Sequence, residues 1–150
     1  MPGIYFHSLV GTENYVAGVE QTGHNRTINR RKFAGDELRQ ILADRDSVQR
    51  RVFDGYRRML AIRVAQPAFH PDAPQTILET GHPSLIAFQR QSLDGGQKIL
   101  VLTNVGNQPV AVDLEAFDRG SFERNLFDEG QTVRRIYELA PFEIGWLTTQ

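Results

Sequence analysis

The pattern of apolar and polar positions changes in kind about halfway along the chain. From residue 36 to about residue 65, apolar residues recur mainly at the three- and four-residue spacing of helices. From residue 76 they form short, partly alternating runs separated by turn residues. A change from helical to strand periodicity is typical of a helical portion followed by an antiparallel sheet. The pattern therefore predicts an α+β chain made of two parts.

The helical pattern is clearest from Ser47 to about Ala65, where Asp46 or Ser47 can cap the first turn. A shorter helix is predicted from Asp36 to Ala43, with acidic residues in its first turn, where the helix dipole favours them. The longer helix also carries a group of arginines, which a solvated face explains better than a nucleic-acid surface because no aromatic platform accompanies them. These arginines are Arg50, Arg51, Arg57 and Arg58.

The second half predicts a β-sandwich, because short strands recur with turn signals between them. The predicted strands cover residues 76–79, 84–91, 98–104, 110–114, 123–127, 132–139 and 142–147, with turns at 94–96, 106–109 and 128–130. In the last strand Phe142, Ile144 and Trp146 share a face, so we expect them to be buried. The segment 67–75 is rich in proline and predicts a linker between the two parts.

The chain opens with the apolar run Ile4-Tyr5-Phe6, which predicts a buried strand, followed by a polar stretch to residue 35 that is rich in glycine and asparagine. A strand that feeds a long polar loop is a common way for α/β enzymes to build a site. A lone strand leaves its backbone groups unpaired. An edge strand remains an alternative, and we expect instead the final strand of a larger barrel.

Composition narrows the function classes. At 150 residues, with 40% hydrophobic and 23% charged residues and a net charge of −1, the chain has no bias toward nucleic acid or membrane surfaces. The absence of cysteine excludes disulfides and thiolate metal sites, and no secretory signal is visible, so we expect a cytoplasmic location. No motif typical of a metal or cofactor site is present, and none is expected.

Two stretches resemble a known family. The opening residues Pro2–Ser8, Gly11, Asn14 and the string Asn25-Arg26-Thr27-Ile28-Asn29-Arg30 resemble the last barrel strand and following loop of the alpha-amylase superfamily (glycoside hydrolase family 13), especially its sucrose phosphorylase branch. The ending Leu139–Leu147 is similar to the last strand of the small β-sandwich that lies behind the barrel in that family, and Leu100–Asn104 matches another of its strands.

The resemblance implies a fold and a division of the chain. Residues 1–66 are expected to form the last β/α unit of a (β/α)8 barrel, with the active-site loop and the outer helices. Residues 67–75 are the linker, and residues 76–150 are the antiparallel C-terminal β-sandwich. The catalytic barrel itself would belong to a longer parent enzyme, of which this chain matches the C-terminal third.

Four residues are the candidates for substrate binding. The resemblance implies that Arg26 reaches the bottom of the glucose pocket and pairs there with an aspartate, which suits a planar guanidinium. On spacing alone, an ordinary surface ion pair is the commoner role. His7 lines the pocket or is a satisfied rim histidine. Tyr15 and His24 are candidates for an acceptor subsite, although ordinary loop roles are commoner, and Arg30 is expected to tie the loop back.

The chemistry expected from the resemblance is glucosyl transfer from sucrose or a related glucoside to phosphate, with retention. Retaining enzymes need two carboxyl groups about 5–5.5 Å apart. The family takes its carboxyl groups from earlier barrel strands, and nothing here matches them. The helix-end acids are explained by capping; they are Asp36, Glu37, Asp44 and Asp46. We therefore expect the chain alone to be inactive, and its residues do not separate phosphorolysis from hydrolysis or one glucoside from another.

Two alternatives remain open. The sandwich could be a non-catalytic module that binds carbohydrate or a partner protein, which would require exposed aromatic side chains in a flat strip. Alternatively, copies of the chain could associate through apolar surface that a complete barrel would normally cover.

Overall fold

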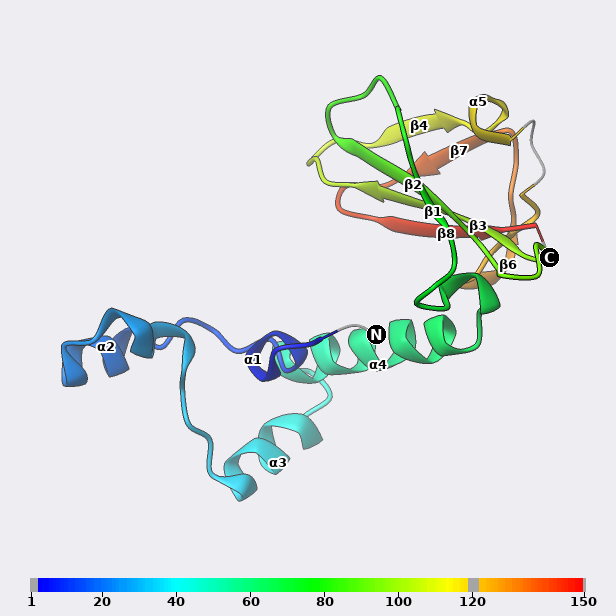
Figure 1. Cartoon of the computed structure of the whole chain (residues 1–150). Helices are drawn as coiled ribbons and strands as arrows, with labels where there is room; N and C mark the ends of the chain where they lie inside the picture. Colours follow the sequence, from blue (N-terminus) through cyan, green and yellow to red (C-terminus); the bar gives the residue numbers. More distant parts are fainter. Residues whose placement is uncertain (1–2, 119–121, 150) are drawn as a thin grey trace. The chain divides into compact units, whose positions relative to one another are not determined.

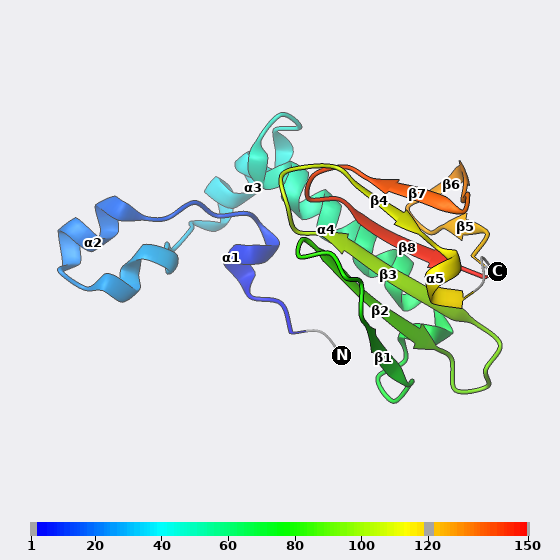
Figure 2. The same ribbon diagram turned by 90° about the horizontal axis from the view of Figure 1, so that it is seen from above.

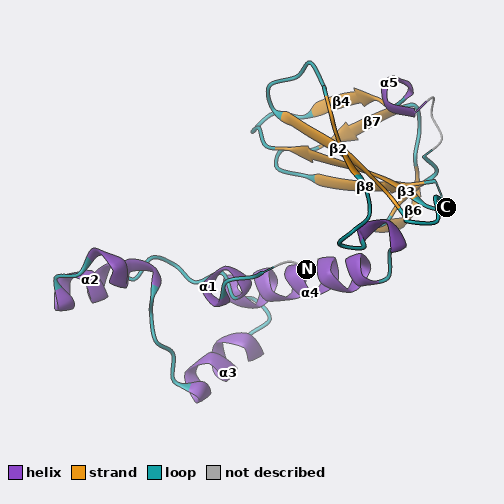
Figure 3. Ribbon diagram, viewed as in Figure 1, coloured by secondary structure: helices purple, strands orange, loops and turns teal. Residues whose placement is uncertain are grey.

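The computed structural model describes residues 3–118 and 122–149. The chain divides into two compact units, Met1–Ala61 and Ile62–Gln150. We refer to them as the helical unit and the sheet unit, because every strand follows Pro74 while the longer helices precede it (Figure 3). The order of elements predicted from the sequence, helices first and strands second, is confirmed.

The helical unit contains short helices and most of one long helix (Figure 1). The elements are α1 (Phe6–Leu9), α2 (Val16–Thr22), the 3₁₀ helix η1 (Asn25–Asn29), α3 (Gly35–Ala43) and α4 (Val48–Val64). The Ser47 hydroxyl accepts a hydrogen bond from the backbone N–H of Arg50 at 3.0 Å and caps α4. The helices predicted at 36–43 and 47–65 are therefore confirmed.

The strand predicted at Ile4-Tyr5-Phe6 does not form in this structure. The backbone N–H of Leu9 donates to Tyr5 O at 3.0 Å and that of Val10 to Phe6 O at 3.1 Å, so this stretch turns into α1. A strand needs a neighbour for its backbone groups, and no strand pairs with these residues in the part of the chain that the structure describes. Local helical hydrogen bonds satisfy the backbone instead.

The polar stretch before residue 35 is also more ordered than a loop. Gly23, with a φ of +67°, ends α2 in the left-handed conformation that favours glycine. The chain then returns as η1, where the backbone N–H of Tyr15 donates to Ile28 O at 2.6 Å and the hydroxyls of Thr22 and Thr27 lie 3.0 Å apart. We call this pair, α2 with η1, the loop hairpin.

The sheet unit contains two antiparallel sheets, whose strands can be followed in Figures 1 and 2. The larger sheet has the order β1-β2-β3-β8-β5-β6, and the smaller one pairs β4 with β7. The strands are β1 (Gln75–Leu78), β2 (Leu85–Gln91), β3 (Lys98–Asn104), β4 (Val110–Asp113), β5 (Arg124–Asn125), β6 (Asp128–Thr132), β7 (Ile136–Leu139) and β8 (Ile144–Thr148). A short helix, α5 (Glu115–Asp118), follows β4.

The apolar core of the sheet unit lies between the two sheets. Leu100 and Leu102 of β3, Leu147 of β8 and Leu139 of β7 are fully buried in it, together with Val112 of β4. Alternation along β2 places Leu85 and Ala87 on the same side, as the sequence predicts. The antiparallel β-sandwich is therefore confirmed as the architecture of this half.

Two details of the predicted strands are wrong. The turn predicted at 128–130 is part of β6, and the real turn is Leu126-Phe127, where the backbone N–H of Phe127 donates to the buried Asn125 side chain at 3.0 Å. Phe142 is 68% exposed and has a φ of +61°, because it sits in the turn before β8 rather than on the strand. Ile144 and Trp146 do share a face of β8.

The segment predicted as a linker packs against the sheet unit. It contains the 3₁₀ helix η2 (Pro67–Phe69), in which Ala68 and Phe69 are buried. The rings of Phe69 and Phe127 each lie 4.7 Å from that of Trp146, so the Trp146 ring is covered and cannot serve as a stacking platform for sugar. Where the domain boundary falls stays a prediction.

Candidate functional site

His7 lies in an aromatic cluster of the helical unit. Its ring centroid is 5.2 Å from that of Tyr5, 5.2 Å from that of Phe6 and 6.1 Å from that of Phe33. Its Nδ1 is 3.1 Å from the Thr12 hydroxyl. Because three rings and a hydroxyl fix the half-buried imidazole, His7 is a satisfied histidine in this structure.

Arg31 connects this cluster to the rest of the helical unit. Its guanidinium lies 4.7 Å from the ring centroid of Phe33 and 6.0 Å from that of Tyr15, within cation–π range. It also forms an ion pair with Glu37 of α3 at 2.5 Å, and Glu37 accepts a further hydrogen bond from the N–H of Ala34 at 3.3 Å. The sequence did not lead us to predict this role of Arg31. The spacing is nevertheless a usable signal, because Phe33 lies two residues and Glu37 six residues after Arg31.

Tyr15 holds the loop hairpin together from inside. Gly18 is buried against the Tyr15 ring, and a Cβ atom at Gly18 would lie 2.2 Å from that ring and 2.9 Å from Thr27. The Tyr15 hydroxyl is 3.5 Å from the side-chain oxygen of Gln21. Tyr15 therefore packs within the hairpin, and its hydroxyl stays at the surface.

His24 and Arg26 lie on the exposed side of the loop hairpin. The N–H of His24 donates to the Thr22 hydroxyl at 3.3 Å, which shapes the turn into η1. Within the described residues, the Arg26 side chain has no hydrogen bond and no ion pair, so its guanidinium is free to meet a ligand or another segment. At the other end of η1, the Tyr5 hydroxyl donates to Asn29 O at 2.9 Å.

The four predicted residues thus separate into two pairs. His7 and Tyr15 belong to the packed interior around Arg31 and Phe33, whereas His24 and Arg26 project from the hairpin into solvent. Their roles in binding substrate remain predictions.

No family model matches the chain, but known proteins are similar to it. It is 38% identical to a glucosylglycerate phosphorylase of Spirochaeta thermophila over 99% of its length, and 38% identical to one of Allomeiothermus silvanus over 98%. A glucosylglycerate phosphorylase of Escherichia coli is 30% identical over 98% of the chain.

The chain is similar to enzymes of the alpha-amylase superfamily. It is similar to the C-terminal part of enzymes of the sucrose phosphorylase type. The chain spans about a quarter of the length of these relatives, with 27%, 24% and 25% of the three proteins covered.

Solved structures share the fold of most of the chain. The trehalulose synthase MutB of Pseudomonas mesoacidophila MX-45 superimposes with a TM-score of 0.57 and 20% identity, over 75% of this chain and 19% of that one. A variant of MutB gives a TM-score of 0.58 over 75% of this chain and 20% of the other. At this identity the likeness concerns the fold alone.

The acidic residues that lie near the helix ends are engaged in local structure. Asp36 pairs with Arg39 at 2.6 Å, and the carboxylate of Asp44 accepts a hydrogen bond from the N–H of Asp46 at 3.0 Å. The described residues contain no group of three side chains suited to holding a metal ion. None of their helices has the length and apolar character needed to cross a membrane.

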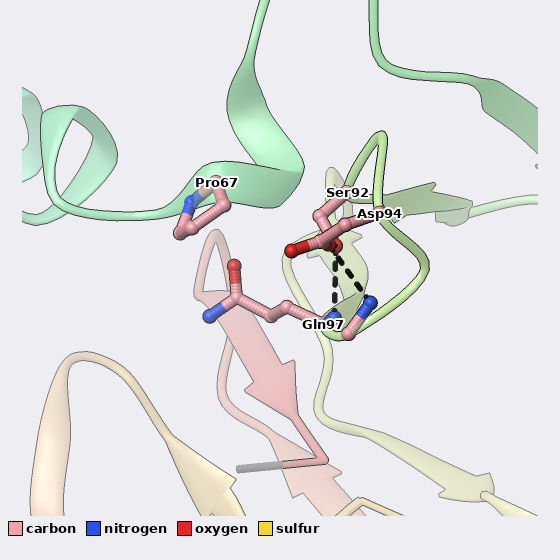
Figure 4. A pocket seen from close by; sticks show the side chains of 5 residues that line it. Pro67, Ser92, Asp94 and Gln97 are labelled. Carbon is pink, nitrogen blue, oxygen red and sulfur yellow. Dashed lines mark hydrogen bonds between the residues drawn. The ribbon is translucent and has the colours of Figure 1, made fainter.

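A shallow pocket of about 280 Å³ lies in the sheet unit, lined by Pro67, Ser92, Asp94, Gly96 and Gln97 (Figure 4). Its polar groups are used by the β2–β3 turn. The Ser92 hydroxyl donates to Asp94 Oδ1 at 2.6 Å, and this bond is the main cause that lowers the pKa of Asp94 below its ordinary value. The Gln97 amide accepts from Ala68 N at 3.0 Å and donates to Gln66 at 2.7 Å. The pocket is therefore a structural feature, and the loop hairpin is the better candidate site.

Proposed function

We propose that this chain supplies the C-terminal part of a retaining glucosyl-transferring phosphorylase. The proposed reaction moves glucose from glucosylglycerate, or from a related glucoside such as sucrose, to phosphate. The observation that carries the proposal is the 38% identity, over 99% of the chain, to a protein named glucosylglycerate phosphorylase. Hydrolysis of the same glucosides is the chemical variant that an assay must separate from phosphorolysis.

In this proposal, residues 1–66 complete the last β/α unit of the barrel. The opening segment would form a strand once a neighbouring strand offers it backbone partners. Its apolar side chains support this, since Tyr5 is 52% and Phe6 43% exposed in the chain on its own. Helix α4 would be the outer helix of that unit, with its apolar stripe toward the barrel.

Arg26 is the residue proposed to contact glucose. Its exposed guanidinium, which has no acidic partner among the described residues, supports a role in pairing with an aspartate and a sugar hydroxyl supplied from elsewhere in the parent enzyme. The catalytic carboxyl pair would also come from outside this chain. The 150-residue chain alone is therefore proposed to be inactive.

A domain-replacement experiment tests the proposal. The matching quarter of the Spirochaeta thermophila protein is replaced by this chain, and glucose 1-phosphate is measured with glucosylglycerate and phosphate. We expect the chimera to release glucose 1-phosphate and the chain alone to release none. A correctly folded chimera without activity, or activity of the isolated chain, would contradict the proposal. Free glucose release in the absence of phosphate measures hydrolysis separately.

A further inference from the structure

The stretch from Arg26 to Lys32 contains several cationic side chains, most of which have no acidic partner among the described residues. It contains Arg26, Arg30, Arg31 and Lys32, and no acidic residue occurs between Gln21 and Gly35. Glu37 neutralises Arg31 through their ion pair. The other three side chains are exposed, and within the described residues they form no hydrogen bond or ion pair. We call residues 26–32 the basic turn.

The arginines of α4 show that this is not the general behaviour of arginine in the chain. Arg50 pairs with Asp54 at 2.6 Å, and the guanidinium of Arg57 lies 5.7 Å from the Phe53 ring centroid. Arg63 lies 4.7 Å from the Phe69 ring centroid and donates to Phe69 O at 3.4 Å. Most α4 arginines thus have contacts within the chain, which the cations of the basic turn lack apart from Arg31.

The backbone of the basic turn is held in place by neighbouring groups. Ile28 O accepts from the N–H of Tyr15 at 2.6 Å, and Asn29 O accepts from the Tyr5 hydroxyl at 2.9 Å. Arg30 and Lys32 are two residues apart in the chain, so their Cα atoms lie at most about 7 Å apart. This is no more than the Debye length of about 8 Å in physiological salt, so the like charges repel one another. A bound anion would remove that repulsion.

We propose that the basic turn binds a small oxyanion, a carboxylate or a phosphate group, through Arg30 and Lys32. The guanidinium group binds both kinds of anion through paired hydrogen bonds, and the lysine adds a point charge. The sequence interpretation expected Arg30 to tie the loop back, but in this structure its side chain has no partner among the described residues. The inference rests on the proposed function only in the choice of glycerate and phosphate as probes.

Anion titrations of the isotopically labelled chain, followed by the backbone amide signals of residues 26–32, test the inference. Sodium glycerate and sodium phosphate are the two probes, glycerol is the neutral control, and sodium chloride keeps the ionic strength constant. We expect saturable shifts confined to the basic turn with at least one anion and none with glycerol. The anion that saturates at the lower concentration identifies the source of the oxyanion.

Charge-removing variants complete the test. The double variant Arg30→Gln with Lys32→Gln is expected to weaken binding at least about tenfold, because each charged hydrogen bond contributes on that scale. Arg51→Gln, which removes an exposed arginine from α4, serves as the matched control and should bind as the unaltered chain does. Shifts that never saturate, or that survive in the double variant, would overturn the inference. An inactive chimera with intact anion binding would refute only the proposed function.

Discussion

At the scale of single residues, Asn104 shows how one polar side chain joins two neighbouring turns of the sandwich. It is fully buried, and its amide nitrogen donates to Gln108 O at 2.7 Å and to Ala140 O at 2.9 Å. Its side-chain oxygen accepts from the N–H of Gly106 at 2.9 Å. One side chain therefore satisfies the turn after β3 and the segment between β7 and β8.

Replacing Asn104 with alanine should be costly. Asn104→Ala leaves buried backbone groups without partners, and we expect the free energy of unfolding of the sheet unit to fall by about 2–4 kcal/mol. Urea denaturation followed by the fluorescence of Trp146, the only tryptophan, measures this. Asn107→Ala, the same change at an exposed position of the same turn, is the control and should stay within about 0.5 kcal/mol. Equal effects of the two variants would contradict the assigned role.

Phe142 carries a conformational cost of a different kind. Its φ of +61° lies in the left-handed region, where side chains other than glycine are strained. Because the ring is 68% exposed, little packing would be lost on its removal. We expect Phe142→Gly to raise the free energy of unfolding by about 0.5–1 kcal/mol, and the β-branched Phe142→Val to lower it. A glycine variant less stable than the unaltered chain in the same denaturation assay would refute this.

The residues differ in how far the sequence could predict them. Asn104 was predicted only as the last residue of a strand, because its three partners lie on turns that sequence spacing does not bring together. Phe142 was misassigned because strand alternation continues through it in the sequence, whereas a left-handed backbone conformation leaves no periodic signal. Arg26 was predicted from the resemblance of residues 25–30 to a family motif. That its side chain has no partner among the described residues could not be predicted, because this depends on the fold.

At the scale of elements, the loop hairpin depends on a glycine where its two segments meet. A Cβ atom at Gly18 would overlap the Tyr15 ring, whereas at Gly55, in the exposed middle of α4, it would meet nothing within 4 Å. The same substitution should therefore have opposite effects at the two positions. At Gly18 the effect of alanine is set by packing against the Tyr15 ring, and at Gly55 it is set by helix propensity.

Gly18→Ala should open the hairpin, and Gly55→Ala should stabilise α4 by about 0.5–1 kcal/mol because alanine is the better helix former. Amide hydrogen exchange at Tyr15, whose N–H is bonded to Ile28 O, reports on the hairpin directly. We expect faster exchange there in Gly18→Ala and unchanged exchange in Gly55→Ala. Unchanged protection of Tyr15 in Gly18→Ala would show that the ring can move aside.

The β2–β3 turn should make the sheet unit sensitive to acid. The hydrogen bond from Ser92, followed by that from the Gly96 N–H, holds the pKa of Asp94 below its ordinary value. A lowered pKa means that the folded state favours the carboxylate, so this stabilisation is present above about pH 4 and is lost as the pH falls through the folded-state pKa. Stability measured against pH should therefore decline more steeply in the unaltered chain than in Asp94→Asn. Glu138→Gln, at an exposed position of β7, should keep the full decline.

Strands that pair with other strands among the described residues were predicted well. The opening segment, which has no such pairing, was not. The apolar run 98–104 became β3 because strands pair on both sides of it. The run Ile4-Tyr5-Phe6 has similar strand propensity, but no strand pairs with it among the described residues, so α1 forms instead. The turn at Leu126-Phe127 was missed because Asn125 forms it through a side-chain bond, without a glycine signal.

At the scale of the whole molecule, the two units differ in how completely each buries its apolar residues. The sheet unit has a continuous core between its sheets, whereas in the helical unit Val10 is the one large apolar side chain that is fully buried among the described residues. This low burial supports the proposal that the helical unit packs against further protein in the parent enzyme. Association of copies through this surface stays a prediction, as does the cytoplasmic location.

The central claim is that this chain brings the Arg26 guanidinium to a glucosyl-binding pocket whose reactive carboxyl groups lie in another part of the parent enzyme. Steady-state phosphorolysis of glucosylglycerate by the chimera with the Spirochaeta thermophila protein, carrying Arg26→Lys, tests this most directly. We expect kcat/KM to fall about 100-fold or more, since an ammonium cannot replace the planar fork, while Arg51→Lys leaves it unchanged. An Arg26→Lys chimera as active as the unaltered chimera would contradict the claim.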